Sequence, residues 1–277
     1  MGAARRYWQE RYLDDLADVL SPPERGGTFQ RVVLLSGGID SLLVLAILNQ
    51  LYPNQILKTV TIDSANSLES AQAGRVAEYF ATDHCVTMVD VEEVLEHLPL
   101  VEGCHYDKLS RVYSHICYYL AMKKVGVRDA VVYSGHGADI LYGNKAKLYL
   151  GLPNENKRGS LEEQRTRAKI SYYRRYNSAG KHLIKLANEM GAKAVLPYRD
   201  SRLAYVNELP YSLIQPLTKQ FVRDAIQKRF ALGELIKCPS MGMQTGTGEY
   251  EEFRQLIKKR FRHVHRSSKE IAAYLTQ

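Results

Sequence analysis

Short apolar segments rich in β-branched residues alternate with amphipathic helical patterns along the first half of the chain. The apolar segments cover 31–36, 56–63, 84–89 and 129–134, with a weaker one at 194–198. Near-continuous apolar strands separated by helices are typical of a parallel sheet that is covered on both faces and built with right-handed crossovers. The pattern therefore predicts an α/β fold with a five-stranded, doubly wound parallel sheet.

Helical periodicity predicts the segments that connect these strands. The predicted helices cover 7–20, 41–52, 67–81 and 107–124. In the first of them Trp8, Tyr12, Leu16 and Val19 recur at helical spacing, which gives an amphipathic helix. Pro53 ends the second helix and Gly126 closes the last, as is usual at helix C-termini.

Strand patterns thin out after about residue 145, and helical patterns dominate the remainder. Ser160 and Glu163 form a capping-box pattern that predicts a helix over 161–175. No repeat or linker divides the 277 residues. We therefore predict one domain, in which a lead helix (1–29), a nucleotide-binding α/β core (30–145) and a mainly helical part (146–277) complete a common site.

Composition narrows the class of protein. The chain is 45% apolar and 25% charged, as in ordinary globular proteins. No apolar run is long enough to span a bilayer, and the N-terminus lacks the apolar core of a signal peptide. The four cysteines stand far apart without a C-x-x-C pair, which argues against disulfides, zinc or an iron–sulfur cluster. We expect a cytoplasmic protein with no membrane partner.

The net charge of +8 is unevenly spread. The segment 169–181 interleaves aromatic and basic residues, and 254–269 carries seven Lys and Arg with no acid. Both could contact nucleic acid through phosphates and stacked bases, although solvated helix faces are the favoured interpretation.

A glycine turn follows the first strand, in the sequence "VVLLSGGIDS" at 32–41. Gly37 and Gly38 let the backbone approach a ligand and turn its N–H groups outward, and the helix that follows adds its positive end. The turn has neither the lysine of a Walker loop nor the spacing of a dinucleotide fingerprint. It therefore predicts a phosphate-binding site of another kind.

The carboxylate of Asp40 inside this turn would repel phosphate unless a cation lay between them. Mg²⁺ binds one or two carboxylates together with phosphate oxygens, so the turn predicts a magnesium–polyphosphate site. A second turn of the same kind, "VVYSGHGADI" at 131–140, follows another predicted strand.

These two motifs resemble those of a known family. "LLSGGIDSL" resembles the pyrophosphate loop of the N-type ATP pyrophosphatases, and "VVYSGHGADILYGN" resembles the asparagine synthetase signature L-S-G-E-G-A-D-E-L-F-G-G-Y. Looser matches follow in order at 195–210, 217–226 and 236–248. The resemblance is to the synthetase domain of class B asparagine synthetases, and it implies an adenine nucleotide alpha hydrolase-like fold with a helical C-terminal portion.

The resemblance also implies roles for individual residues. Asp40 and Asp139 would bind Mg²⁺, Lys219 would stabilise the triphosphate, Lys237 would do something similar, and Asp63 would contact adenosine. Further residues would bind ATP or pyrophosphate, together with Asp40: Leu35, Ser36, Gly37, Gly38, Ser41, Ser134, Gly135 and Gly137.

The sequence departs from the family in two ways. The chain opens on the lead helix with Gly2 in place of a nucleophilic cysteine, so we expect no glutaminase domain. His136 and Ile140 replace the two glutamates of the signature. Relatives that close β-lactam rings use a tyrosine where His136 stands, and a histidine pKa near 6.5 suits a general base at neutral pH.

We therefore interpret the chain as an ATP-dependent ligase. It would adenylate a small-molecule carboxylate, release pyrophosphate and pass the acyl group to ammonia or an amine, with His136 as candidate base. A separate glutaminase subunit is one source of the ammonia. Two alternatives stay open: an ATP pyrophosphatase that modifies a nucleobase or nucleic acid, and an inactive ATP-binding partner of a glutaminase.

Overall fold

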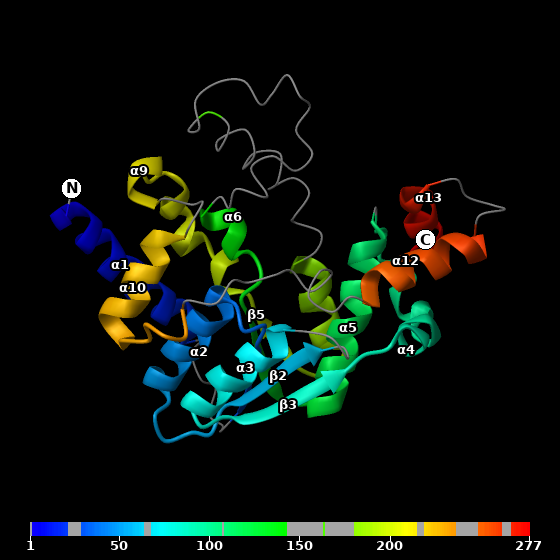
Figure 1. Ribbon diagram of the computed structural model, residues 1–277, viewed down its shortest axis with the longest axis horizontal. Coiled ribbons are helices and arrows are strands. Elements are labelled where there is room, and N and C mark those ends of the chain that lie inside the picture. The colour runs from blue at the N-terminus through cyan, green and yellow to red at the C-terminus, as the bar shows by residue number, and fades with distance from the viewer. Residues whose placement is uncertain are drawn as a thin grey trace.

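The computed structural model describes residues 2–21, 29–63, 68–106, 108–142, 163, 180–214, 219–236, 249–261 and 267–277. Five strands form one sheet, in the order β3-β2-β1-β4-β5, and every neighbouring pair is parallel. The strands are β1 (Gln30–Leu34), β2 (Lys58–Asp63), β3 (Asp83–Met88), β4 (Ala130–Ser134) and β5 (Lys193–Val195). The predicted α/β class with a five-stranded, doubly wound parallel sheet is confirmed (Figure 1).

Helices occupy most of the remaining described chain. The α-helices are α1 (Gly2–Leu20), α2 (Ile39–Leu51), α3 (Leu68–Tyr79), α4 (Val91–Glu96), α5 (Leu109–Val125), α6 (Ala138–Tyr142), α9 (Tyr211–Ile214), α10 (Gln220–Phe230), α12 (Glu249–Phe261) and α13 (Ser268–Leu275). Short 3-10 helices are η1 (Leu98–Val101), η3 (Pro197–Arg199) and η4 (Ser201–Asn207). Residues 180–189 are also helical.

The predicted elements differ from these bounds in detail. The lead helix begins at Gly2 rather than residue 7. The strand predicted over 194–198 was too long, because Pro197 lacks a backbone N–H and opens η3 instead. The helix predicted over 161–175 lies outside the described residues except for Glu163.

Successive residues of β1 face opposite layers of the molecule, which is why Val32, Val33 and Leu34 are all apolar and buried. Val33 belongs to a cluster formed with α1, α2 and α10, here called the α2-side cluster. Val32 and Leu34 belong to a cluster formed with α5 and residues 183–187, here called the α5-side cluster. Both faces of the sheet are therefore covered, as parallel sheets require.

Helix α2 is buried along most of its length. Its sequence IDSLLVLAILNQL is buried at nine positions, eight of them consecutive (Ser41–Leu48), as expected of a helix that is apolar all round in its middle. Helices α1 and α10 pack on it and on each other, and the Gln9 side chain donates a hydrogen bond to the Phe221 carbonyl at 3.0 Å. The two helices thus close over α2 from opposite ends of the sequence.

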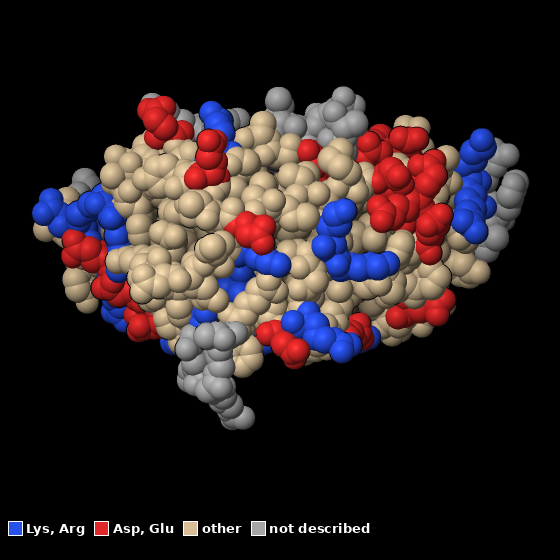
Figure 2. Space-filling model, turned by 90° about the horizontal axis from the view of Figure 1, so that it is seen from below, with Lys and Arg blue, Asp and Glu red and all other residues tan. Residues whose placement is uncertain are grey.

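A further cluster, the α12-side cluster, joins α4, η1, α5, α12 and α13. The backbone N–H groups of His105 and Tyr106 donate to the carbonyl and hydroxyl oxygens of Thr276 at 2.8 and 2.7 Å. Acidic side chains gather on the surface at this end of the molecule (Figure 2), where Glu249 lies near Glu252 and the carboxylates that begin α4. Within the described residues, no helix combines the length and apolar character needed to cross a bilayer.

Candidate functional site

Two loops meet at the carboxyl edge of the sheet, between β1 and β4. The chain moves from β1 outward to β2 and β3, then returns to the other side of β1 for β4 and β5. Leu34 and Ser134, the last residues of β1 and β4, are in register, so the loops that follow begin side by side. Such a switch in strand order is where open α/β sheets bind their ligands.

The first loop, 35–38, is held in shape by its own serines. The Ser36 N–H donates to Ser41 Oγ at 3.2 Å, and Ser41 Oγ donates to the Gly38 carbonyl at 3.1 Å. Gly37 has a φ of +69°, which favours glycine. Gly38 precedes the first turn of α2, so the positive end of a long buried helix faces the loop.

Leu35 fixes this loop to the neighbouring strand. Its N–H donates to the Val60 carbonyl at 2.9 Å, and its carbonyl accepts from Thr61 Oγ1 at 2.7 Å. Asp63 lies at the end of the same strand and is 8% exposed. Its carbonyl accepts from the Val89 N–H at 3.1 Å, so the structure places Asp63 at the ligand edge of β2.

The second loop, 135–137, touches the start of α2 through Gly135 and touches η3 through Gly137. A Cβ on Gly135 would lie 2.9 Å from Ser41 N and 3.1 Å from the Asp40 carbonyl carbon. Gly137 has a φ of +102°, and a Cβ there would lie 2.9 Å from Arg199 Cγ. The second loop approaches α2 and η3 this closely because neither glycine carries a side chain.

His136 lies between these glycines and is half-buried. Its N–H donates to Ser134 Oγ at 3.2 Å. Ile140 lies four residues further on, within α6. Lys237, which was predicted from the sequence, lies outside the described residues.

Lys219 brings the two loops' acids together. Its Nζ lies 2.6 Å from Asp40 Oδ2 and 2.8 Å from Asp139 Oδ1, and the residue is only 8% exposed. Burial lowers the pKa of Lys219, but the two carboxylates raise it by more, so its pKa lies above the ordinary value. The ammonium is therefore charged at neutral pH and joins three segments that are distant in the sequence.

The backbone at Lys219 is unusual. Its φ of +51° places it in the left-handed region, directly before the first turn of α10. Such a conformation costs a non-glycine residue about 1 kcal/mol or more and is concentrated at functional sites. The packing of α10 on α1 and α2 holds it there.

Three tyrosines support the first loop from behind, and sequence reasoning missed them in this role. Tyr198 Oη donates to the Asp40 carbonyl at 2.8 Å, and the hydroxyls of Tyr12 and Tyr142 are hydrogen-bonded to each other. Burial raises the pKa of all three, so they remain neutral. Two of them could have been noticed in the sequence, because Tyr142 and Tyr198 lie inside the segments 131–144 and 195–210 that resemble the family.

The arrangement fits a Mg²⁺–polyphosphate group. Two carboxylates, Asp40 and Asp139, converge on one cation, and two carboxylates are enough for Mg²⁺ when phosphate oxygens supply further ligands. The described residues hold no group of three or more His, Cys, Asp or Glu that would form a metal site by themselves. The glycine loops and the start of α2 would receive the phosphates.

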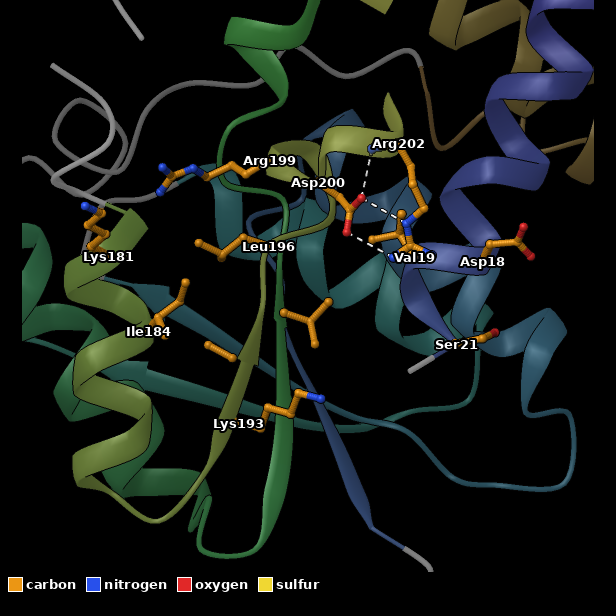
Figure 3. Close-up of a pocket in the computed structure, with 12 residues that line it drawn as sticks. Asp18, Val19, Ser21, Lys181, Ile184, Lys193, Leu196, Arg199, Asp200 and Arg202 are labelled. Atoms are coloured by element: carbon orange, nitrogen blue, oxygen red, sulfur yellow. Dashed lines mark hydrogen bonds and ion pairs between the residues drawn. The ribbon is translucent and has the colours of Figure 1, made fainter. Parts of the chain in front are cut away.

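A separate pocket of about 530 Å³ lies along the edge strand β5, between the end of α1 and the helical residues 180–189 (Figure 3). Its charged lining residues are Asp18, Lys181, Lys193, Arg199, Asp200 and Arg202. Arg202 is already paired with Asp200 through two bonds of 2.9 Å, and this pairing lowers the pKa of Asp200. None of the predicted site residues lines the pocket, although Arg199 adjoins Gly137.

A scan against family models matches residues 30–265 to asparagine synthase. The chain belongs to the asparagine synthase family. The match spans both glycine loops, Asp40, Asp139 and Lys219. Membership supports an ATP-using enzyme of the N-type ATP pyrophosphatase superfamily, and the resemblance seen in the two motifs is confirmed.

The comparison with curated proteins found no match. Among solved structures, a U34-tRNA thiolase NcsA from Methanococcus maripaludis is 12% identical, with a TM-score of 0.44, over 98% of this chain and 78% of that one. An NH3-dependent NAD synthetase from Campylobacter jejuni is 17% identical, with a TM-score of 0.37, over 84% and 98%. An NAD⁺ synthetase from Burkholderia pseudomallei is 18% identical, with a TM-score of 0.32, over 82% and 90%. Likeness at this level carries no argument about the reaction of this chain.

Proposed function

We propose that the protein is an ATP-dependent amide-forming ligase. It adenylates a small-molecule carboxylate, releases pyrophosphate and transfers the acyl group to ammonia or an amine. The observation that carries the proposal is the convergence of Asp40, Asp139 and Lys219 beside two touching glycine loops. Retention of both carboxylates and the lysine is more than nucleotide binding alone requires.

The first step joins a carboxylate oxygen of the substrate to the α-phosphorus of ATP, and the bond to the β-phosphate oxygen breaks. The N-terminal end of α2 would bind the leaving pyrophosphate. Mg²⁺, held by Asp40 and Asp139, supplies charge neutralisation when bound. The Lys219 ammonium would stabilise the negative charge that grows on the leaving group.

In the second step the nitrogen nucleophile attacks the acyl carbon, and AMP leaves. An amine must lose a proton as the C–N bond forms, and we propose that His136 accepts it. The nitrogen would come from free ammonia, from an amine substrate or from a separate glutaminase subunit.

The decisive experiment measures pyrophosphate release from Mg-ATP across a library of carboxylic acids, each with and without ammonia or an amine. Mass spectrometry should find AMP and a product equal to acid plus amine minus water. Asp40→Asn should abolish release, whereas Lys228→Met should not, because Lys228 is an exposed lysine of α10 paired with Glu10 at 2.6 Å. ATP binding without release across the whole library would instead favour an inactive partner subunit.

The role of His136 has its own test. His136→Ala should leave ATP binding intact and slow amide formation by about 10²-fold or more. If His136→Ala forms amide at the normal rate while Asp40→Asn forms none, the base is another group.

A further inference from the structure

The carboxylates of Asp40 and Asp139 share one buried cation, the ammonium group of Lys219. Lys219 Nζ lies 2.6 Å from Asp40 and 2.8 Å from Asp139. The three side chains are only 10%, 18% and 24% exposed, respectively. Two ionised carboxylates this close and this poorly solvated repel each other, so a positive charge between them stabilises the pair.

The ammonium stands at a point common to both carboxylates. A divalent ion held by both carboxylates would occupy the region between them that Nζ fills. An ammonium nitrogen and a divalent ion cannot share that region, because they repel and their contact radii overlap. In this arrangement, cation binding at the acid pair and the Lys219–carboxylate contacts exclude each other.

We propose that Lys219 acts as a resident cation that closes the metal site until nucleotide arrives. The polyphosphate brings its own divalent ion and offers its oxygens to the ammonium, so Lys219 exchanges carboxylate partners for phosphate partners. The divalent ion then takes over the acid pair. Free divalent ions bind poorly, and binding of ion and nucleotide is positively coupled. This inference rests on the proposed role of Asp40 and Asp139 as the metal-binding pair.

The left-handed backbone of Lys219 favours such an exchange. The residue immediately precedes α10, whose buried residues Phe221 and Val222 anchor the helix in the α2-side cluster. The backbone of Lys219 is thus fixed, while its flexible four-carbon side chain carries the charge. The ammonium can swing from the acids to a phosphate without any movement of the helix.

The test uses Mn²⁺ as the probe, because electron paramagnetic resonance counts the free ion directly. Wild-type protein without nucleotide should bind Mn²⁺ weakly, whereas Lys219→Met should bind it at least about tenfold more tightly. Lys219→Arg, which keeps the charge, should stay as weak as wild type, and Lys228→Met is the matched control on α10. Adding Asp40→Asn to Lys219→Met should remove the gain.

Thermal unfolding gives a second readout. Mn²⁺ should raise the melting temperature of Lys219→Met and leave that of wild type unchanged in the absence of nucleotide. Equal Mn²⁺ affinity of wild type and a folded Lys219→Met would overturn the proposal. If Lys219→Met does not fold, tight binding of free Mn²⁺ by wild type alone would overturn it, and weak binding that tightens with α,β-methylene-ATP would support it.

Different results would contradict the proposed function and the proposed role of Lys219. If wild type binds neither Mn²⁺ nor α,β-methylene-ATP together with Mn²⁺, the site is not a metal–nucleotide site at all. If wild type binds that analogue tightly with Mn²⁺ and Lys219→Met gains no affinity for free Mn²⁺, only the gating role of Lys219 is wrong.

Discussion

Gly135→Ala should push the two loops of the candidate site apart. The new Cβ would lie 2.9 Å from Ser41 N, 3.1 Å from the Asp40 carbonyl carbon and 3.3 Å from Asp40 Cβ. Two of these are backbone atoms of the first turn of α2, so no flexible side chain can yield. Ordinary contact begins near 3.4 Å, so the loops must separate by about 0.5 Å, at an overpacking cost of about 1–2 kcal/mol.

This separation should affect the proposed chemistry more than stability. A displacement of about 1 Å at reacting groups can cost about 10²-fold in rate, so about 0.5 Å should cost roughly tenfold in kcat/KM for pyrophosphate release. Urea unfolding should show the loss of about 1–2 kcal/mol. A variant with wild-type stability and wild-type nucleotide affinity would refute the close contact between the loops.

Gly74→Ala is the matched control. Gly74 lies inside α3, and a Cβ there meets nothing within 4 Å. Because alanine is the better helix former, this change should stabilise the protein by about 0.5–1 kcal/mol and leave nucleotide binding unchanged.

The remaining predictions concern single groups. Burial lowers the pKa of His115 to about 4 and keeps the side chain neutral. Its contribution to the free energy of unfolding is therefore complete above pH 6.5 and is lost as pH falls toward 4. Between pH 7 and 5, wild type should lose about 2 kcal/mol more than His115→Gln in urea unfolding. Tyr198→Phe removes the 2.8 Å bond to the Asp40 carbonyl and should cost about 1 kcal/mol, whereas Tyr79→Phe at an exposed site should cost nothing measurable. Ser267→Ala removes the capping box of α13 and should cost about 1 kcal/mol by thermal unfolding.

The strands and α2 could be predicted from the sequence because an element that is buried on both sides has a continuous apolar run in its own sequence. The end of β1 (Val32–Leu34) and the middle of α2 (Leu42–Leu48) are continuous apolar runs, and Pro53 and the glycine turns mark where they stop. The glycine loops were also visible, since their residue types follow directly from close backbone approach and positive φ. The apolar runs and the glycine loops are recognisable because each depends on the types of residue that are adjacent in the sequence.

The contacts that complete the site join residues that are distant in the sequence, so no pattern of neighbouring residues predicts them. Lys219 reads as an ordinary basic residue before a helix, and only the fold brings it to Asp40, 179 positions away. The bond from Tyr198 to the Asp40 carbonyl crosses 158 positions. The family resemblance supplied a role for Lys219 but not for Tyr198, because the motif names residues rather than their partners.

The basic segment at 254–269 also reads differently in three dimensions. Arg254 pairs with Glu251, one turn earlier on α12, and that helix begins with a run of acids. Acidic side chains gather at this end of the molecule (Figure 2). The sequence already shows acids directly before the run of positive charge, and the fold adds Asp90 and Glu92 near Glu249, so the solvated-face interpretation remains our prediction.

The closure of α1 and α10 over α2 has a consequence for biosynthesis. Gln9 pairs with a carbonyl 212 positions later, so α2 cannot be fully covered until α10 has left the ribosome. At about 5–20 residues per second, that wait is on the order of 10 s or more. Throughout it, the apolar stretch LLVLAIL at 42–48 is exposed in the nascent chain. A chaperone that binds apolar segments should therefore associate with ribosome-bound chains that end before residue 220, and release them once α10 emerges.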